Sequence, residues 1–266
     1  MSLSSVRVSG GAAEPRHVWI LHGFMGRGQN WQSFARRLCA ARPELDLELI
    51  DLRMHGGSQG LPGPHTLAAC ADDLEAHAGA SGLPDVLIGH SFGGRVALTL
   101  AGRGLAGQLW VLDAAPASSG ERGDTETVRV LAALAELPPR FVDRRAFTAA
   151  LEARGAAPAI AAWLAKNLVR EPDGLRFGLE LPALRALLED HDRTDCWPLV
   201  EHPPDSLDLR FVLAGRGSVL AEDDRARLEA LASQGVVTVD TLPRAGHWLH
   251  VDDPARLSEL LLAGLA

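Results

Sequence analysis

The residues best suited to covalent chemistry lie in the segment Gly89-His90-Ser91-Phe92-Gly93, a G-x-S-x-G pattern. The apolar run Val86–Ile88 precedes it and an Ala/Leu-rich helical pattern follows it, so Ser91 is expected on a sharp turn from a strand into a helix. Small residues on both sides allow such a turn, and the start of the helix favours developing negative charge. The pattern favours a serine nucleophile, although a glycine-rich turn with a capping serine would have the same letters.

A second segment, His22-Gly23-Phe24-Met25-Gly26, directly follows the expected strand His17–Leu21. In acyl transfer, the tetrahedral intermediate carries an oxyanion that needs preorganised N–H donors. The backbone N–H groups of Phe24 and Phe92 are the expected pair, because one lies in this loop and the other follows the serine. A His-Gly pair after a strand indicates by itself only a tight turn. The serine segment later in the chain strengthens its interpretation as part of an oxyanion site.

Ten histidines compete for the role of general base, and those after Ser91 fit the chain order nucleophile, acid, histidine. His247 is expected to fill the role, because it lies in a loop between the last expected strand and the last helix. His250 is the local alternative and is more typical of a packing or surface histidine, and His191 and His202 fit less well. No H-x-H or H-E-x-x-H spacing occurs, so we expect no metal and no cofactor.

The elements that must position these residues alternate along the chain. Short Leu-rich or β-branched runs alternate with Ala/Leu helical patterns, which predicts a parallel sheet covered by helices. The expected strands are His17–Leu21, Leu47–Leu52, Asp85–Gly89, Gln108–Leu112, Leu209–Ala214 and Val236–Leu242. The expected helices around them are Asn30–Ala41, Thr66–Ala80, Phe92–Arg103 and Asp253–Leu262.

One long stretch interrupts this alternation. From Pro116 to about Pro204 the sequence shows no convincing strand, and prolines separate its helical patterns. The expected helices there are Thr127–Leu137, Arg144–Arg154, Pro158–Arg170 and Leu181–Asp190. An insert of this length predicts a helical cap over residues 116–204 and a core made of residues 1–115 and 205–266. Its position after a central strand would let it cover the carboxyl ends of the sheet, where ligands bind in open α/β sheets.

Composition restricts the class of protein. The chain has 266 residues, a formal net charge of −8 and no basic cluster, so a nucleic-acid partner is not expected. Three scattered cysteines indicate no disulfide framework, and no apolar run is long enough for a membrane span, so we expect a cytoplasmic protein. A single lysine among 26 basic residues is attributed to compositional bias. Oligomeric state is not predicted.

Several of these segments together resemble the α/β-hydrolase superfamily across nearly the whole chain. They are His22–Gly26, Asp51–Ser58, the elbow at Ser91 and Ala245–Trp248. Within the superfamily, the chain is most similar to small bacterial esterases related to the ABHD11-type hydrolases. Their D-x-R-x-H-G loop matches Asp51–Gly56, and their insert carries a stretch similar to Asp173–Phe177. The chain departs from them at Met54, which replaces a polar or glycine residue, and at Gly178, which replaces an asparagine.

The resemblance also bears on the acid that would orient His247. In the commonest superfamily pattern this acid lies in a G-x-x-D loop, but the matching loop here ends in Ser218. The later acids Asp223 and Asp224, like Glu222, are typical of a first helical turn. The resembled esterases carry an aspartate one element earlier, which implies Asp113 as the acid and Ser218 as an auxiliary hydrogen-bond partner. An alternative is that Asp113 only caps the turn that follows its strand.

These observations predict a serine hydrolase that cleaves a small-molecule carboxylic ester or thioester through an acyl-enzyme on Ser91. Serine at the elbow argues against haloalkane dehalogenases and epoxide hydrolases, which use aspartate there. A menaquinone-pathway-type lyase, a carbon–carbon hydrolase and a cofactor-free haloperoxidase remain alternatives on the same fold. A catalytically silent binding protein is the non-enzyme alternative, and the presence of both Ser91 and His247 disfavours it.

Overall fold

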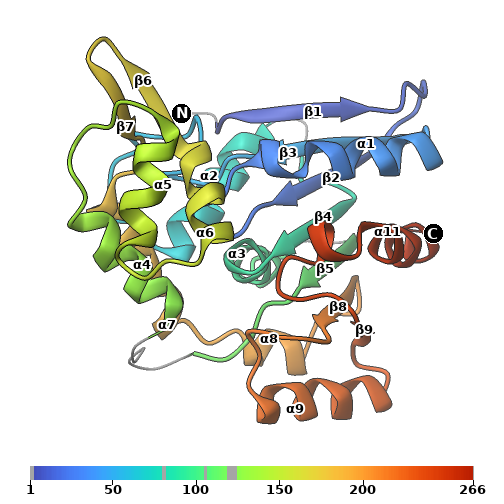
Figure 1. Cartoon of the computed structure of the whole chain (residues 1–266). Helices are drawn as coiled ribbons and strands as arrows, with labels where there is room; N and C mark the ends of the chain where they lie inside the picture. Colours follow the sequence, from blue (N-terminus) through green and yellow to red (C-terminus); the bar gives the residue numbers. More distant parts are fainter. Residues whose placement is uncertain (1–2, 80–81, 105–106, 119–124, 266) are drawn as a thin grey trace.

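The computed structural model describes residues 3–79, 82–104, 107–118 and 125–265. These residues form a seven-stranded sheet in the order β1-β3-β2-β4-β5-β8-β9, in which β1 pairs antiparallel with β3 and the other neighbours pair parallel (Figure 1). The strands are β1 Ser5–Ser9, β2 Arg16–Leu21, β3 Leu45–Ile50, β4 Val86–His90, β5 Gly107–Leu112, β8 Leu207–Ala214 and β9 Thr238–Leu242. The expected α/β architecture with a mostly parallel sheet is confirmed, and each expected strand is present.

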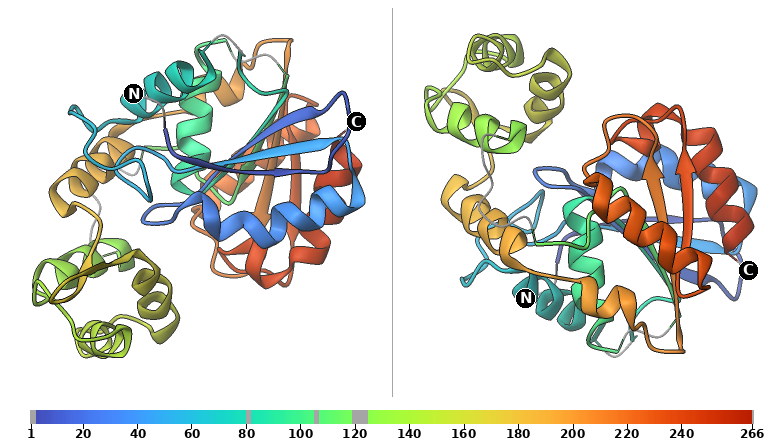
Figure 2. Two further views of the ribbon diagram at one scale, coloured as in Figure 1. Left: turned by 90° about the horizontal axis from the view of Figure 1, so that it is seen from above. Right: turned by 90° about the horizontal axis from the view of Figure 1, so that it is seen from below.

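Helices cover both faces of this sheet (Figure 2). One face packs against α1 Gln32–Ala41 and α11 Pro254–Gly264, and the other packs against α2 Leu67–Ala78, α3 Phe92–Ala101 and α9 Glu222–Ser233. The 3-10 helix η1 Gly28–Trp31 leads into α1, and α10 Leu249–Asp252 precedes α11. Every residue of β4 is buried, as expected for a parallel strand covered on both faces. The end of the α2 helix expected at Ala80 lies outside the described residues.

The segment between β5 and β8 contains a hairpin that the sequence analysis did not predict. Its elements are α4 Glu126–Ala135, α5 Arg144–Glu152, α6 Pro158–Leu164, η3 Ala165–Asn167, β6 Leu168–Glu171, β7 Gly174–Phe177, α7 Leu181–Arg193 and α8 Trp197–Glu201. The expectations of an all-helical insert and of a helix from Pro158 to Arg170 were therefore wrong, because α6 ends at Leu164 and β6 pairs antiparallel with β7. Pro172 and Asp173 form the turn between the strands, as these residue types favour.

Most of the insert lies on one side of the sheet. Figure 1 shows α4, α5, α6 and the hairpin beside the ends toward which the parallel strands point, and Figure 2 shows this group standing apart from the sheet. The buried guanidinium of Arg95 in α3 holds both ends of the connection, because it donates to the backbone oxygens of Ala117 (2.5 Å) and Thr194. In contrast, Trp197 of α8 packs under Arg227 of α9, so α8 lies with the helices of the sheet. In the described ranges, no helix is long and apolar enough to cross a membrane.

Candidate active site

Ser91 lies on a strained turn between β4 and α3. Its backbone adopts φ 53° and ψ −119°, a region that favours glycine. The flanking glycines are required by space: a Cβ on Gly89 would lie 2.4 Å from the carbonyl oxygen of Gly93. A Cβ on Gly93 would lie 2.6 Å from the carbonyl oxygens of Leu21 and His22. The turn therefore needs glycine on both sides to place the serine at the carboxyl end of the central strand.

The structure brings Ser91, His247 and Asp113 together in one chain of hydrogen bonds. The Oγ of Ser91 lies 3.0 Å from Nε2 of His247, and Nδ1 of His247 lies 2.7 Å from Oδ2 of Asp113. A carboxylate at that distance fixes the imidazole proton on Nδ1, which leaves Nε2 free to accept the serine proton. The Asp113 side chain is fully buried, while the His247 side chain is 28% exposed, so the charged partner is shielded and the imidazole is accessible.

The Asp113 carboxylate is held in its charged form by its surroundings. Burial raises the pKa of this group, but hydrogen bonds from His247, the Ser218 hydroxyl and the Ala214 amide outweigh burial and hold the pKa below its usual value. The Ser218 hydroxyl donates to Oδ1 at 2.6 Å, the Ala214 amide donates to the same atom at 3.0 Å, and the Val219 amide donates to Oδ2 at 3.3 Å. Ser218 thus contacts the carboxylate of Asp113, one step from His247.

The other carboxylates considered as partners of His247 lie in a helix. Glu222, Asp223 and Asp224 form the first turn of α9, as expected from their sequence. Asp113 reaches His247 from β5 because β5 pairs parallel with β8, and β8 pairs parallel with β9, the strand that precedes the His247 loop. The end of β5 and the loop after β8 therefore meet at the same rim of the sheet.

Two further histidines support the loop that carries His247. The Nε2 of His90 donates to the backbone oxygen of His247 at 2.7 Å, and burial, followed by the neighbouring charge of His247, lowers the pKa of His90 well below its ordinary value. The ring of His250 stacks on Trp31 with centroids 3.8 Å apart, and burial is the main reason why its pKa is lowered to about 3. His250 is a packing residue, as its sequence position suggested, but it also lines the cavity described below. The role of His90 was missed, although it lies inside the serine motif.

The loop after β2 places Phe24 beside the serine turn. The rings of Phe24 and Phe92 lie 5.6 Å apart, and Phe92 opens α3, where the first amides have no acceptor within the helix. Next to Phe24, Met25 has φ 59°, and contacts from other segments hold its backbone. Its amide donates to Nε2 of His55 at 3.0 Å, and its carbonyl oxygen accepts from Nδ2 of Asn167 in the insert at 2.9 Å.

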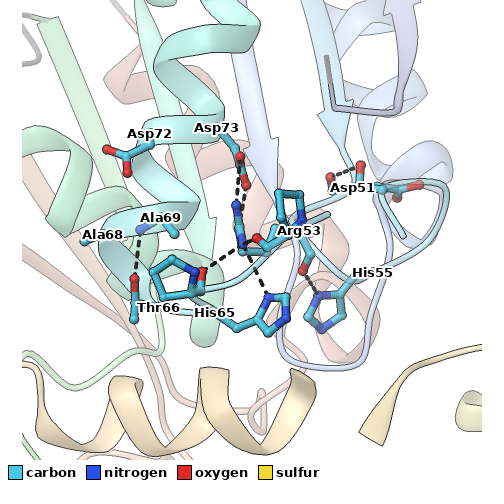
Figure 3. A network of polar contacts seen from close by, with 12 residues as sticks. Asp51, Arg53, His55, His65, Thr66, Ala68, Ala69, Asp72 and Asp73 are labelled. Atoms are coloured by element: carbon cyan, nitrogen blue, oxygen red, sulfur yellow. Dashed lines mark hydrogen bonds and ion pairs between the residues drawn. The ribbon is translucent and has the colours of Figure 1, made fainter. Parts of the chain in front are cut away.

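His22 and His55 join the loop after β2 to the loop after β3. Nε2 of His22 accepts the Leu52 amide at 3.0 Å, and Nδ1 of each ring lies within hydrogen-bond distance of a nearby backbone oxygen. The second loop is braced by Arg53, whose guanidinium binds Asp73 of α2 at 2.7 Å and the backbone oxygens of Pro62 and Pro64 (Figure 3). The D-x-R-x-H-G motif therefore acts as a support for the loop that carries Phe24.

We expect the free energy of unfolding to decrease as the pH falls from about 6.5 to about 4. Burial lowers the pKa of His22 to about 4 and that of His55 to about 3, while in an unfolded chain both rings protonate near pH 6.5. The unfolded state therefore binds more protons across this interval, so acidification favours it. The substitution His55→Gln keeps an acceptor for the Met25 amide. It should reduce the slope of unfolding free energy against pH by about 1.4 kcal/mol per unit in urea titrations. An unchanged slope would show that His55 takes up its proton in the fold as readily as in the unfolded chain.

A cavity of about 390 Å³ opens beside Ser91 and His247. Its floor comes from the loop after β2 and from Trp31, and its roof comes from α4 and α6 of the insert. Aromatic and aliphatic side chains dominate the lining, among them Phe24, Met25, Trp31, Val130, Ile160, Trp163 and Trp248. A mostly apolar pocket of this size, with a few polar groups at one end, fits a small organic molecule.

The fold and this arrangement define the class of protein. The profile of the Alpha/beta hydrolase family matches residues 20–260, and the chain belongs to this family, as its motifs implied. It is 28% identical over its whole length, and over 86% of the relative, to the sn-1-specific diacylglycerol lipase ABHD11 of Mus musculus. It is also 28% identical to the N-formylmaleamate deformylase of Pseudomonas putida, covering 89% of this chain and 84% of the relative. Among solved structures, a marine microorganism esterase matches 98% of both chains with a TM-score of 0.81 and 24% identity, a likeness of fold.

Proposed function

We propose that the protein is a serine hydrolase that cleaves a carboxylic ester or thioester through an acyl-enzyme on Ser91. One observation carries this proposal: Ser91, His247 and Asp113 form an unbroken chain of hydrogen bonds beside a largely apolar cavity. Lipase and esterase relatives support hydrolysis of a small-molecule ester. The buried, unpaired cysteines Cys39, Cys70 and Cys196 are compatible with the reducing cytoplasm.

The proposed reaction has two halves. The Oγ of Ser91 attacks the substrate carbonyl carbon while Nε2 of His247 takes the hydroxyl proton, and Asp113 stabilises the imidazolium. The amides of Phe24 and Phe92 would donate to the oxyanion of the intermediate. His247 then returns the proton to the departing alkoxide or thiolate, which leaves the acyl group on Ser91. In the second half, a water molecule loses its proton to His247 and attacks the acyl carbonyl, and His247 then returns that proton to the departing Oγ of Ser91, which releases the acid and the free serine.

We also propose that residues 116–204 act as a cap that shapes access to Ser91. The support for this role is that α4 and α6 supply one wall of the cavity while the loop after β2 supplies the other. The part most directly involved runs from α4 to the hairpin, because α8 packs against α9. Changes in this part should alter chain-length preference more than the chemical step.

Covalent labelling and a substrate panel test the proposal together. A fluorophosphonate should label the wild-type chain at one site, and peptide mass spectrometry should locate the label on Ser91. The panel should include p-nitrophenyl esters, acyl-CoA thioesters and, because one relative is a deformylase, N-formylmaleamate. Labelling together with ester or thioester turnover supports the proposal. Turnover of a lyase substrate with no ester, thioester or amide hydrolysis would replace it, because a lyase would use the serine for proton transfer without acylation.

A further inference from the structure

The only lysine of the chain, Lys166, lines the cavity beside Ser91. It lies in η3, directly after α6, and its cavity-lining neighbours Ala159, Ile160, Ala162 and Trp163 have the spacing of one helical face. This face of the insert is otherwise apolar. Lys166 adds a positive charge at the end of this face. The 25 other basic residues are all arginine, and none of the arginines that the structure describes lines the cavity.

The contacts around Lys166 place it near His250 and near the loop after β2. The next residue, Asn167, donates its side-chain amide to the backbone oxygen of Met25, one residue from Phe24. His250 is also near, because the charge of Lys166 contributes, after burial and His247, to lowering the pKa of that ring. Lys166 thus lies over the part of the cavity where the loop after β2 and the His247 loop meet.

Within the part of the chain that the structure describes, no carboxylate lies within ion-pair distance of the Lys166 ammonium group, although arginines throughout the fold are paired with acids. Three of the four histidines that line the cavity, His22, His90 and His250, have lowered pKa values, chiefly because they are buried. The other ionised group in the lining is Glu126, which is exposed in the first turn of α4, where the helix dipole stabilises a negative charge. Lys166 is therefore an exposed cation without an ion-pair partner at the rim of a mostly apolar cavity.

We propose that Lys166 binds a carboxylate carried by the same substrate molecule as the scissile bond, so that the substrates are monoesters or thioesters bearing one free carboxylate. The inference rests on the proposed function and narrows its substrate class. One ammonium group matches the charge of one carboxylate, whereas a phosphate dianion would leave charge unneutralised in a lining that already contains Glu126. The carboxylate could belong to the acyl part or to the alcohol part of the ester.

Three matched phenyl esters test this substrate class. Phenyl hexanoate is neutral, phenyl hydrogen adipate carries the carboxylate on the acyl part, and 4-(hexanoyloxy)benzoate carries it on the alcohol part. For each anionic ester, the ratio of its kcat/KM to that of phenyl hexanoate measures selectivity. Lys166→Met should lower this ratio roughly five- to tenfold for one anionic ester, mainly through KM, as expected for loss of one charge-assisted contact. The anionic ester whose ratio falls shows whether the substrate carries its carboxylate on the acyl part or on the alcohol part.

Matched variants separate a local contact from a change of net charge. Arg170→Met removes the same charge from β6, outside the cavity, and should leave both ratios unchanged. Lys166→Arg should retain most of the selectivity, and Glu126→Gln should raise it by removing a repelling charge. The inference is overturned if Lys166→Met lowers the kcat/KM values of all three esters equally, if it changes neither ratio, or if Arg170→Met has the same effect.

A binding measurement tests the carboxylate site at Lys166 independently of hydrolysis. Calorimetric titration of monomethyl adipate, which carries one carboxylate, into Ser91→Ala protein should show binding that weakens roughly five- to tenfold with the added Lys166→Met substitution. If no ester is hydrolysed, the proposed function fails and this titration alone tests the anion site. Absence of monomethyl adipate binding, or equal binding with and without Lys166, would overturn the site even if neutral esters are cleaved. Tighter binding of inorganic phosphate than of monomethyl adipate would also overturn the assignment to a carboxylate.

Discussion

Replacing Ser91 by alanine should reduce kcat for ester hydrolysis by about 10⁶-fold, because the nucleophile and its base act as a unit. The residual rate should come from binding and from the oxyanion donors, which this substitution leaves in place. Initial rates with the best ester of the panel, together with loss of fluorophosphonate labelling, measure this effect. Circular dichroism and urea unfolding of the same variant control for loss of the fold. Near parental turnover by folded Ser91→Ala protein would exclude Ser91 as the nucleophile.

The backbone of Ser91 adds a second readout to the same experiment. Its φ of 53° is unfavourable for serine and for alanine alike, but not for glycine. Ser91→Gly should therefore abolish activity as Ser91→Ala does, and its free energy of unfolding should exceed that of Ser91→Ala by about 1 kcal/mol or more. Equal or lower stability of the glycine variant would show that the turn is not strained at this position.

The centre of the fold could be predicted from the sequence because its strands are short apolar runs with clear boundaries. β4, for example, is buried along its whole length and leads directly into the serine motif. The edge strand β1 was not predicted, because Ser5–Ser9 alternates between exposed and half-buried residues and pairs with β3 at the edge of the sheet. Its strand conformation depends on that tertiary contact, which a local pattern does not reveal.

The hairpin in the insert was missed for a different reason. The Leu/Val/Arg composition around Leu168 suits a helix as well as a strand, so the Ala-rich helix before it was extended too far. The signal that could have corrected this is Pro172-Asp173-Gly174, a turn sequence in which Pro172 and Asp173 separate the two four-residue strands and Gly174 begins the second. The tertiary contact that completes the hairpin is the pairing of Leu175 with Phe141 through two 2.8 Å hydrogen bonds.

At the site, motifs located the side chains that we propose as catalytic but not the side chains that hold them in place. Ser91 and His247 follow from their local sequences and chain order. His55 and Asn167 act on Met25 through hydrogen bonds that span 30 and 142 residues, respectively. Contacts of that range depend on how loops meet above the sheet, which no local spacing encodes. His22 and His55 lie in motifs that the sequence analysis identified. Their role as neutral histidines that support the loops through hydrogen bonds was not predicted.

Replacing Asp113 by asparagine should lower kcat by up to about 10⁴-fold while preserving the fold. The Asp113 carboxylate accepts from Nδ1 of His247 at 2.7 Å. In the proposed reaction it stabilises the imidazolium that forms when Ser91 is deprotonated. An asparagine can keep its carbonyl oxygen toward the Ser218 hydroxyl and the Ala214 amide. Its NH₂ group would then face Nδ1, which favours the imidazole tautomer with its proton on Nε2. That tautomer cannot accept a proton from the serine.

The matched controls for this prediction are Asp223→Asn and Asp224→Asn, which remove the same charge from the first turn of α9 and should change kcat less than twofold. The reverse ranking would show that the acid lies in that helix. A second test uses the contact between Ser218 and Asp113, whose oxygens are 2.6 Å apart. Because both positions border the same space next to His247, Ser218→Asp in the Asp113→Asn protein should recover activity at least tenfold by supplying the carboxylate from the loop after β8. If Asp113→Asn were nearly silent, Asp113 would be a turn residue and not the partner of His247. If Asp113→Asn is inactive and the added aspartate brings no recovery, the carboxylate must come from β5 and the loop after β8 cannot replace it.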